Sequence, residues 1–351
     1  MTGVPAQSPL HAAIVKLAHH SPLTADDAAE AFGVIMRGEA TTVQIAAMLT
    51  GLRVRGETAE IVAGVVRALR TVMLRLDSAD PDSLVDTCGT GGGAVTTFNI
   101  STAAALLAAG AGVRIAKHGN RSFTSRCGSA DVLEALGVKI EVPLATMAAT
   151  LESAGIVFMY APLMHPAMRH VGPVRRELAI PTVMNVVGPL ANPAGARRQV
   201  VGVADPNRVP ILAGALLELK SLHSLVVHGE PGLDEISPLG LTSVVEVRDG
   251  RTTQWMIDPA EFGYKNLTAD SLAGGDSADN ARIIMEILGG SDAGSDRAAA
   301  HAAVVMNAAA AIYVSGNVPT YAEGVAAARV ALERGDGIRA LERLRSAYGA
   351  S

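Results

Sequence analysis

The sequence predicts an α/β protein with a small N-terminal helical domain and a larger α/β domain, whose mostly parallel central sheet is flanked by helices. Residues 10–75 place apolar side chains at helical spacing and show no strand pattern. From Pro81 onward, short apolar strands alternate with helices, and glycines follow several helix ends. We assign residues 1–78 to the helical domain, with a joining segment near 166–195, and residues 79–165 and 196–351 to the α/β domain.

Composition excludes several classes of protein. Of the 351 residues, 49% are hydrophobic and only 3% aromatic, so the core consists mainly of Ala, Leu, Val and Ile. A net charge of -5 argues against a nucleic-acid partner. The longest apolar run, residues 103–111, is about half of a membrane span, and the N-terminus lacks a signal-peptide pattern. Cys88 and Cys127 fit no zinc spacing. We therefore expect a reduced, cytoplasmic protein without membrane contact.

The N-terminal helices have recognisable caps and apolar stripes. Thr24 and Thr42 are the predicted N-caps of two helices. Two stripes recur at helical spacing, formed by Ile45, Met48, Leu49 and Leu52 and by Ile61, Val65, Val66 and Leu69. These residues carry no evident chemistry, so we expect this domain to provide a dimer surface.

The α/β part divides into a regular series of elements. Strands are predicted at 84–86, 113–116, 156–160, 200–203 and 224–227. Helices are predicted at 101–109, 131–136, 145–154 and 207–219, and over most of 278–348. Asp249-Gly250 indicates the turn of a hairpin between 244–248 and 252–257. Residues 166–192 interrupt the alternation with a helix and a Pro/Gly-rich stretch, which could pack on the N-terminal helices.

A glycine-rich loop follows the first strand. Asp86-Thr87-Cys88-Gly89-Thr90-Gly91-Gly92-Gly93 leads to Phe98-Asn99-Ile100-Ser101-Thr102, which opens a helix. Glycines allow backbone N–H groups to approach an anion, and a helix start adds further N–H groups with a positive dipole end. The pattern is neither a dinucleotide fingerprint nor a Walker A loop. A phosphate site is therefore one interpretation, and a glycine turn whose Ser and Thr merely cap the helix is the other.

Basic residues follow the second strand. Lys117-His118-Gly119-Asn120-Arg121, with Arg126, puts four basic or titratable side chains at the sheet edge where open α/β proteins bind ligands. In an acidic protein such a concentration favours an anion site, although a solvated basic loop remains the alternative. Ser122, Thr124, Ser125 and Ser129 could cap the next helix or bind phosphate.

These segments together resemble the anthranilate phosphoribosyltransferase family. The resemblance rests on GTGG, FNIST, AKHGNRS and GSADVLEALGV, followed by HPAMRHVGPVRREL, NVVGPLANPAG and VVHGEPGLDEIS, in order from about residue 84 to 237. It implies transfer of the 5-phosphoribosyl group from phosphoribosyl pyrophosphate to the amine of anthranilate in tryptophan biosynthesis, by a homodimer with two magnesium ions per monomer.

The resemblance also implies roles for individual residues. Phosphoribosyl pyrophosphate would be bound by Gly89, Gly92, Gly93, Thr97, Asn99, Ser101, Thr102, Lys117, Ser125 and Ser129. Anthranilate would be bound by Gly89, His118, Asn120, His165 and Arg175. Magnesium would be held by Ser101, Asp234 and Glu235. Gly93 departs from the family, which usually has Asp there, and this puts one metal or pyrophosphate contact in question.

The implied chemistry explains the residue types. Departure of pyrophosphate builds negative charge, which fixed donors, Lys117 and a metal can stabilise. Asp234 and Glu235 supply the hard oxygens that magnesium prefers, and Pro231-Gly232 suggests a loop in which both can face a metal. Two exposed acids on a turn would be the alternative. An aromatic amine is already neutral at pH 7, so no general base is certain, and we expect proximity to carry much of the rate.

Other interpretations lead to different experiments. A pyrimidine nucleoside phosphorylase shares the fold, and a non-catalytic paralogue that binds nucleic acid or a nucleotide could share it too. The second is mildly favoured by Gly93 and opposed by Lys117, Asp234 and Glu235. Arg169, His165 and His170 could guide anions inward or be ordinary surface residues. We interpret Cys88 and Cys127 as small buried thiols, with a regulatory disulfide as the alternative.

Overall fold

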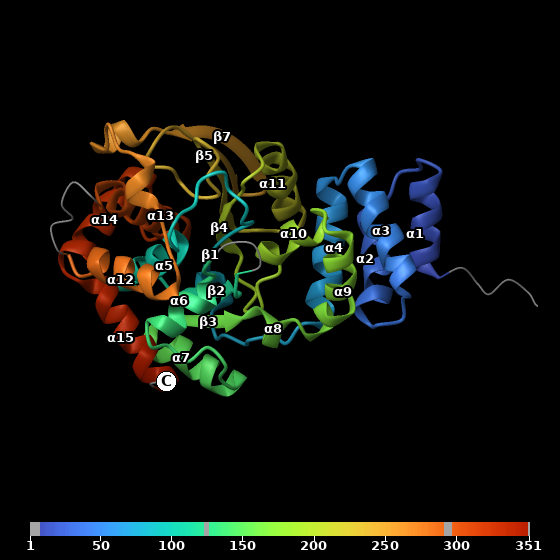
Figure 1. Cartoon of the computed structure of the whole chain (residues 1–351), viewed down its shortest axis with the longest axis horizontal. Coiled ribbons are helices and arrows are strands. Elements are labelled where there is room, and N and C mark those ends of the chain that lie inside the picture. The colour runs from blue at the N-terminus through green and yellow to red at the C-terminus, as the bar shows by residue number, and fades with distance from the viewer. Residues whose placement is uncertain (1–7, 123–125, 291–296, 350–351) are drawn as a thin grey trace, which may run out of the picture.

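The computed structural model describes residues 8–122, 126–290 and 297–349. Its N-terminal part is a bundle of four helices (Figure 1), which are α1 (Pro9–Ala18), α2 (Ala25–Met36), α3 (Thr42–Arg55) and α4 (Ala59–Val72). Both predicted stripes are buried. Thr24 caps α2 as predicted. The cap of α3 is Thr41, not Thr42, because Thr41 forms a reciprocal capping box with Gln44, three residues further on.

The larger part contains a seven-stranded sheet in the order β3-β2-β1-β4-β5-β6-β7. Its strands are β1 (Val85–Gly89), β2 (Ile115–Gly119), β3 (Ile156–Tyr160), β4 (Arg198–Gly202), β5 (His223–Gly229), β6 (Thr242–Arg248) and β7 (Arg251–Ile257). Strands β1 to β5 are parallel, and β6 and β7 form the antiparallel hairpin predicted at Asp249-Gly250. The predicted fold class is therefore confirmed.

Two strands run further than the apolar pattern indicated. β1 continues past Asp86 through Thr87 to Gly89, and β2 continues through Lys117 and His118 to Gly119. Thr87, Lys117 and His118 were expected in loops, but their side chains are buried. They occupy regular strand positions because each finds partners inside the protein. Polar side chains of the candidate site therefore belong to the strands themselves and not only to the loops that follow them.

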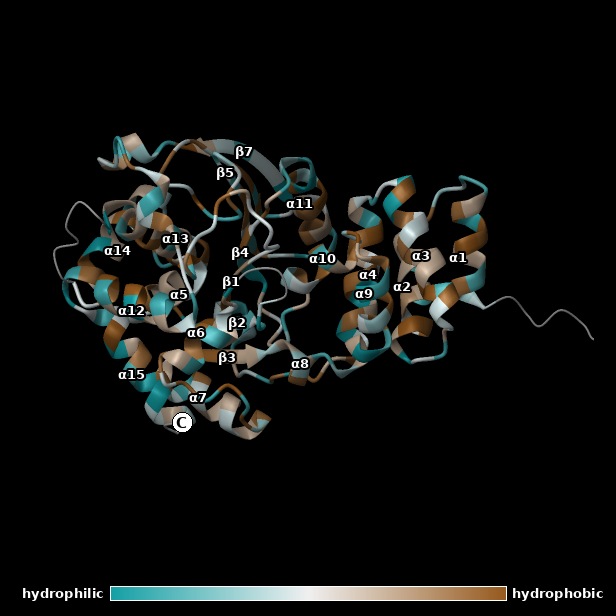
Figure 2. Cartoon of the chain, in the orientation of Figure 1, coloured by the Kyte–Doolittle hydropathy of each residue, from teal (hydrophilic) through white to brown (hydrophobic). Residues whose placement is uncertain are grey.

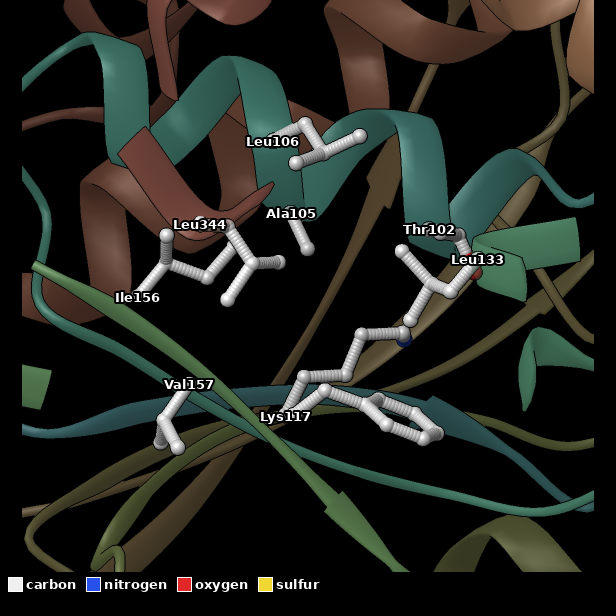
Figure 3. Close-up of a pocket in the computed structure, with 9 residues that line it drawn as sticks. Thr102, Ala105, Leu106, Lys117, Leu133, Ile156, Val157 and Leu344 are labelled. Atoms are coloured by element: carbon white, nitrogen blue, oxygen red, sulfur yellow. The ribbon is translucent and has the colours of Figure 1, made fainter. Parts of the chain in front are cut away.

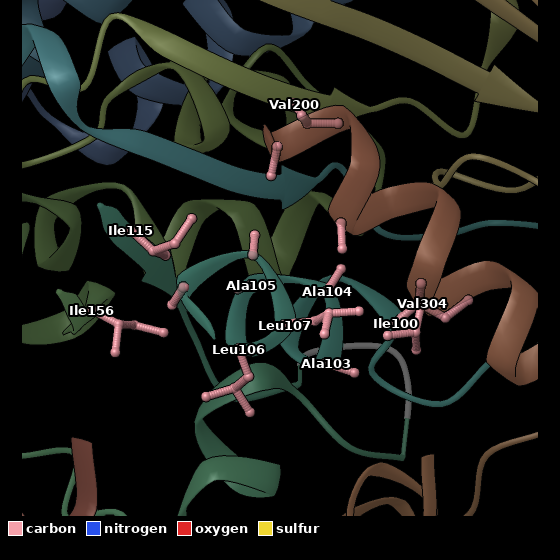
Figure 4. Close-up of a cluster of buried hydrophobic side chains, with 14 of the residues drawn as sticks. Ile100, Ala103, Ala104, Ala105, Leu106, Leu107, Ile115, Ile156, Val200 and Val304 are labelled. Carbon is pink, nitrogen blue, oxygen red and sulfur yellow. The ribbon is translucent and has the colours of Figure 1, made fainter. Parts of the chain in front are cut away.

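Helices cover both faces of the sheet. One face carries α5 (Ile100–Gly110), α12 (Ser277–Leu288), α13 (Ala298–Ser315), α14 (Tyr321–Glu333) and α15 (Asp336–Tyr348), with α6 (Ser129–Ala135) and α7 (Leu144–Ala154) beside β3. The other face carries α11 (Val209–Glu218), which packs on α4. Val200 lies in the first core and Val201 in the second, as strand alternation requires. Figure 4 shows the alanine- and leucine-rich α5 at the centre of the first core.

The interrupting segment packs on the helical bundle, as predicted. It forms α8 (Ala161–Met164), α9 (Gly172–Leu178), α10 (Met184–Val187) and the 3₁₀ turns Pro166–His170 and Gly188–Leu190. Further 3₁₀ turns lie at Pro81–Ser83, Pro206–Arg208, Pro259–Phe262 and Ala269–Leu272. α9 contacts α3, and α10 contacts α4. This arrangement puts the joining segment between the bundle and the carboxyl ends of β2 and β3 (Figure 1).

One helix in the described part of the chain, α13, is long and apolar enough to cross a membrane by length and composition. Inside the protein, 83% of that stretch is buried. α13 therefore has the character of a core helix.

Candidate functional site

The glycine loop lies where the strand order reverses. The chain leaves β1 for β2 on one side and later returns to β4 on the other. Ligands of open α/β sheets bind at such a point, beyond the carboxyl ends of the strands. Gly91 and Gly92 have φ of 70° and 82°, a region that favours glycine. A Cβ at Gly89 would lie only 2.4 Å from Asp234 Oδ2, so a side chain at this position would displace the Asp234 carboxylate.

The side chain of Lys117 extends from β2 toward the end of β1 and the start of α5. Its ammonium donates to the backbone carbonyl of Thr87 at 2.6 Å and lies 3.3 Å from Ser101 Oγ. Burial lowers its pKa, while the nearby Asp86 opposes that shift. Figure 3 shows the side chain reaching toward Thr102 beside a small internal cavity. Lys117 is thus a buried cation at the start of α5.

Asp234 and Glu235 lie in the loop between β5 and β6, as predicted. Asp234 Oδ2 accepts from Gly91 N at 2.7 Å, and Glu235 Oε1 accepts from Ser101 N at 3.1 Å. Burial raises the pKa of both carboxyls, and the charge of Asp234 adds to the shift at Glu235. Two half-buried carboxylates so close to one another are poorly stabilised as anions, and a divalent cation would stabilise them. These residues, with Ser101 Oγ, therefore fit a magnesium ion.

The same contacts occupy N–H groups at the start of α5 and in the glycine loop. The N–H groups of the helix start were expected to face a phosphate, yet Ser101 N donates to Glu235. Gly91 N likewise donates to Asp234. The two acids therefore occupy donors of the predicted anion site, and a phosphate can use these donors only when the carboxylates turn away.

The remaining predicted phosphoribosyl pyrophosphate residues are arranged around the start of α5. Asn99 donates to Cys127 O at 3.1 Å and accepts from Asn280 at 2.9 Å. Thr102 Oγ1 is buried and has no hydrogen-bond partner among the described residues. Gly93 and Thr97 lie half-buried in the loop. Ser129 begins α6 and bonds the backbone of Asn120. Ser125 lies outside the described residues.

His118 and His165 meet beside the joining segment. Their ring centroids lie 4.9 Å apart, and both Nε2 atoms are buried without a hydrogen-bond partner in the described chain. Burial lowers the pKa of His118 to about 3, with the neighbouring His165 adding to the shift. Burial likewise lowers the pKa of His165 to about 4. Both rings are therefore neutral at pH 7. His165 is not one of the exposed histidines that would guide anions by charge.

Arg175 lies on α9, on the same joining segment. Its side chain is half-buried, and burial lowers its pKa. None of the described residues forms an ion pair with it. The neighbouring Arg176 is exposed, as expected. Arg175 is thus a partly desolvated guanidinium that is available for a ligand carboxylate.

The predicted cluster of basic side chains is not one patch. Lys117 lies under the glycine loop and His118 packs on His165, while Arg121 forms ion pairs with Asp131 and Glu134 on α6. Sequence proximity misled here because successive strand residues face opposite sides of the sheet. The charge of Arg121 is therefore neutralised by the acids of the neighbouring helix α6. Asn120 is exposed and its Oδ1 accepts from Arg121 N.

Two site residues were not identified from the sequence. Asp86 is fully buried, and its carboxylate accepts from Asn192 Nδ2 at 2.7 Å and from His118 N at 3.2 Å. Burial raises the pKa of Asp86 to about 6. In the sequence, Asp86 could have been noticed as a charged residue in an apolar strand, and Asn192 as the Asn of the GPLANP motif. Of the two cysteines, Cys127 is buried and Cys88 half-buried, and neither forms a disulfide within the described residues.

Comparisons with known proteins agree with this geometry. Residues 81–338 match the glycosyl transferase family, a/b domain, and residues 11–73 match the helical bundle domain of that family. The anthranilate phosphoribosyltransferase of Rubrobacter xylanophilus is 49% identical over 95% of this chain and 96% of its own length. The crystal structure of the enzyme from Thermus thermophilus has a TM-score of 0.89 at 41% identity, covering 96% of this chain and 99% of the other.

A second solved structure has bound substrate. Anthranilate phosphoribosyltransferase from Saccharomyces cerevisiae, in complex with phosphoribosyl pyrophosphate and magnesium, superposes with a TM-score of 0.87 at 29% identity, and 98% of each chain is covered. The sequence similarity extends over nearly the whole chain, both domains match, and the site residues converge at one edge of the sheet. This chain therefore belongs to the anthranilate phosphoribosyltransferase family, glycosyltransferases of tryptophan biosynthesis.

Proposed function

We propose that this chain transfers the 5-phosphoribosyl group of phosphoribosyl pyrophosphate to the amine of anthranilate, giving N-(5-phosphoribosyl)anthranilate and pyrophosphate. The observation that carries the proposal is the convergence of Lys117, Asp234 and Glu235 on the glycine loop and the start of α5, in a chain whose relatives are named for this activity. The test is the loss of anthranilate fluorescence when phosphoribosyl pyrophosphate and magnesium are added. Absence of turnover would contradict the proposal, and phosphorolysis of thymidine or uridine would indicate a nucleoside phosphorylase instead.

The donor substrate belongs at the glycine loop. Gly89, Gly92, Gly93 and Thr97 form its wall, and Asn99, Ser101, Thr102, Ser125 and Ser129 supply further polar groups. We propose that Lys117 stabilises the negative charge of the departing pyrophosphate from beneath the loop, where low solvent exposure strengthens its effect. Thr102 supports this assignment, because its buried hydroxyl has no partner within the described residues.

Magnesium use fits both the family and the site. The yeast relative was solved with phosphoribosyl pyrophosphate and magnesium. We propose two ions per monomer, held by Ser101, Asp234 and Glu235, because their oxygens are the hard ligands that magnesium prefers. When bound, magnesium neutralises the charge of pyrophosphate. The chain's own groups then position the ribose carbon for the amine.

The acceptor belongs between the joining segment and the glycine loop. A yeast relative was solved with 4-fluoroanthranilate. We propose that Arg175 pairs with the anthranilate carboxylate, while Gly89, Asn120, His118 and His165 line the pocket for the ring and amine. Since the amine is neutral at pH 7, orientation rather than deprotonation is the main requirement. We propose that the reaction takes place in the cytoplasm, and that residues 1–78 form the helical domain and residues 79–165 and 196–351 the α/β domain, joined by a segment near 166–195.

We predict that Arg175→Ala weakens anthranilate binding. Loss of a charge-assisted contact to the carboxylate should raise KM for anthranilate roughly 10- to 100-fold and leave KM for phosphoribosyl pyrophosphate within about twofold. Steady-state kinetics with each substrate varied in turn provides the measurement. Arg176→Ala is the matched control, because its side chain is exposed on the same helix. The assignment is wrong if KM for phosphoribosyl pyrophosphate changes instead.

We predict that Gly93→Asp changes the dependence on magnesium. A Cβ at this position would lie 3.3 Å from Asp234 Oδ1, so the new carboxylate would join the acidic pair. We expect tighter binding of phosphoribosyl pyrophosphate at saturating magnesium and weaker binding at low magnesium, because the three acids repel one another without the metal. Titrations across a magnesium series compare the parent with Gly93→Asp and with the uncharged Gly93→Asn. Superimposable curves would show that position 93 does not contribute to metal binding.

We propose a homodimer formed through the helical domain. The outer face of α3 exposes Val43 and Val54, which are 75% and 80% accessible, with the exposed Ala47 between them at helical spacing. In Figure 2, α3 is drawn between α2 and α1, in the half of the bundle away from the α/β domain, and α1 is the outermost helix. An apolar stripe of this kind on a surface helix favours association.

The predicted dimer can be disrupted at this stripe. Light scattering at micromolar concentration should give a dimer for the parent and a monomer for Val43→Asp with Val54→Asp, because two charges would be buried at the interface. Val330→Asp is the control, since Val330 is exposed on α14 in the α/β domain. A monomeric parent, or a dimer that survives the double substitution, contradicts the assignment.

A further inference from the structure

Asn280 lies on α12, in the C-terminal region of the chain, and its side chain is buried. Its Oδ1 accepts from Gly275 N at 2.8 Å, and its Nδ2 donates to Asn99 Oδ1 at 2.9 Å, across 181 residues of sequence. α12 contacts both α5 and α6. A residue of a helix for which the sequence indicated no chemistry therefore contacts one of the residues predicted to bind the donor substrate.

The turn before α12 packs on the segment that precedes α5. Leu272 O accepts from Phe98 N at 3.0 Å. A Cβ at Gly274 would lie 2.7 Å from Phe98 Cα and 2.8 Å from Asn280 Oδ1, so a side chain at this position would force the two segments apart. Backbone contacts therefore place Asn280 beside Asn99, independently of the hydrogen bond between the two amides.

Backbone groups at the two ends of this chain of hydrogen bonds fix the orientation of both amides. The N–H of Gly275 can only donate, so it requires the oxygen of Asn280. At the other end, Asn99 Nδ2 donates to Cys127 O at 3.1 Å, and a carbonyl can only accept. The oxygen of Asn99 therefore faces Asn280, and its nitrogen faces the loop before α6.

Asn99 occupies the N-cap position of α5, but its side chain does not cap the helix. An asparagine at this position ordinarily accepts from one of the first N–H groups of the helix. Here Asn280 holds the carbonyl oxygen instead, and Glu235 accepts from Ser101 N. Asn99 is half-buried, and one of its two amide N–H groups has no partner among the described residues. The site thus presents an N–H donor at Asn99 and not a free carbonyl oxygen.

We propose that Asn280 is a positioning residue for the donor substrate, because it turns the Asn99 oxygen away from the start of α5 and leaves an Asn99 N–H for an oxygen of phosphoribosyl pyrophosphate. This inference rests on the proposed function, in which Asn99 belongs to the donor site. Phosphoribosyl pyrophosphate is rich in oxygen acceptors, so an N–H donor attracts it and a carbonyl oxygen at the same place repels it. Released from Asn280, Asn99 can cap α5 and would compete with the substrate for the first N–H groups of the helix.

Calorimetric titration with phosphoribosyl pyrophosphate and magnesium, without anthranilate, measures donor binding in the absence of turnover. We expect Asn280→Ala to weaken this binding about tenfold, the size expected for the loss of one or two hydrogen bonds. Asn280→Asp keeps the size of the side chain and the acceptor for Gly275 N but loses the N–H donor to Asn99, and it should weaken binding at least as much. The test therefore does not depend on the folding of one variant. Tyr348→Phe should bind like the parent and controls for general destabilisation, since the buried Tyr348 hydroxyl forms two backbone hydrogen bonds, both to Phe158.

A double-mutant cycle shows whether Asn280 acts through Asn99. If it does, adding Asn280→Ala to Asn99→Ala should weaken binding by less than about a further twofold. In steady-state kinetics, KM for phosphoribosyl pyrophosphate should follow the same pattern, while KM for anthranilate changes less than about twofold. Unchanged binding in both Asn280 variants, or losses that multiply in the double variant, would overturn the inference. If the parent binds phosphoribosyl pyrophosphate with the expected coupling but does not convert anthranilate, the proposed function fails and the positioning role of Asn280 stands.

Discussion

Replacing Asp234 by Asn together with Glu235 by Gln should reduce turnover by a factor of at least about 100 at ordinary magnesium concentrations. The two amides keep the size of the side chains but lose the negative charge that binds a divalent cation. Without the metal, the charge that develops on pyrophosphate is opposed only by Lys117 and the loop N–H groups. The measurement is the initial rate of anthranilate fluorescence loss. The exposed acids Glu261 and Asp270, changed in the same way, provide the control.

The same double variant should fold at least as well as the parent. Burial raises the pKa of both carboxyls in the folded chain. A carboxyl with a raised pKa binds its proton more tightly when folded, so its ionisation above the unfolded pKa, about 4, opposes folding. Replacing both ionisable groups by amides removes that penalty at pH 7. Thermal unfolding should show an unchanged or higher Tm, and a large decrease would mean that these acids hold the loops in place rather than a metal.

Lys117→Met should reduce kcat/KM for phosphoribosyl pyrophosphate by a factor of at least about 100, the effect of deleting one fixed donor to developing negative charge. Methionine fills a similar volume, so the packing against Thr102 and the sheet is kept. Because burial lowers the pKa of Lys117, its charge is already unfavourable for folding at pH values below the unfolded pKa, and the variant should remain folded.

A charge-conserving variant distinguishes position from charge. Lys117→Arg keeps a cation, but the planar guanidinium cannot reproduce the 2.6 Å contact with Thr87 O in the same space. We expect it to recover little of the lost activity. Kinetics with each substrate varied provides the measurement, and KM for anthranilate should change least. Activity of Lys117→Met close to that of the parent would assign the charge stabilisation to the metal alone.

Local patterns predicted much of the fold because they report local physics. The spacing of apolar residues and the glycines that follow helix ends predicted the alternation of strands and helices. Asp249-Gly250 predicted the hairpin. Where a prediction failed, tertiary contacts outweighed local propensity. β2 does not end at Ala116, since buried partners allow Lys117 and His118 to continue the strand.

By itself, the sequence determined the fold class, the family resemblance and the residue types of the site, because apolar periodicity, glycine positions and ordered motifs are properties of the linear chain. Only the tertiary structure decided which of those residues meet. It separated Arg121 from Lys117, it placed Asp234 and Glu235 on the N–H groups of Gly91 and Ser101, and it joined Asp86 to Asn192. The residues that meet lie far apart along the chain, and Arg121 lies beyond the end of β2. Their proximity depends on strand order and packing, which no local pattern encodes.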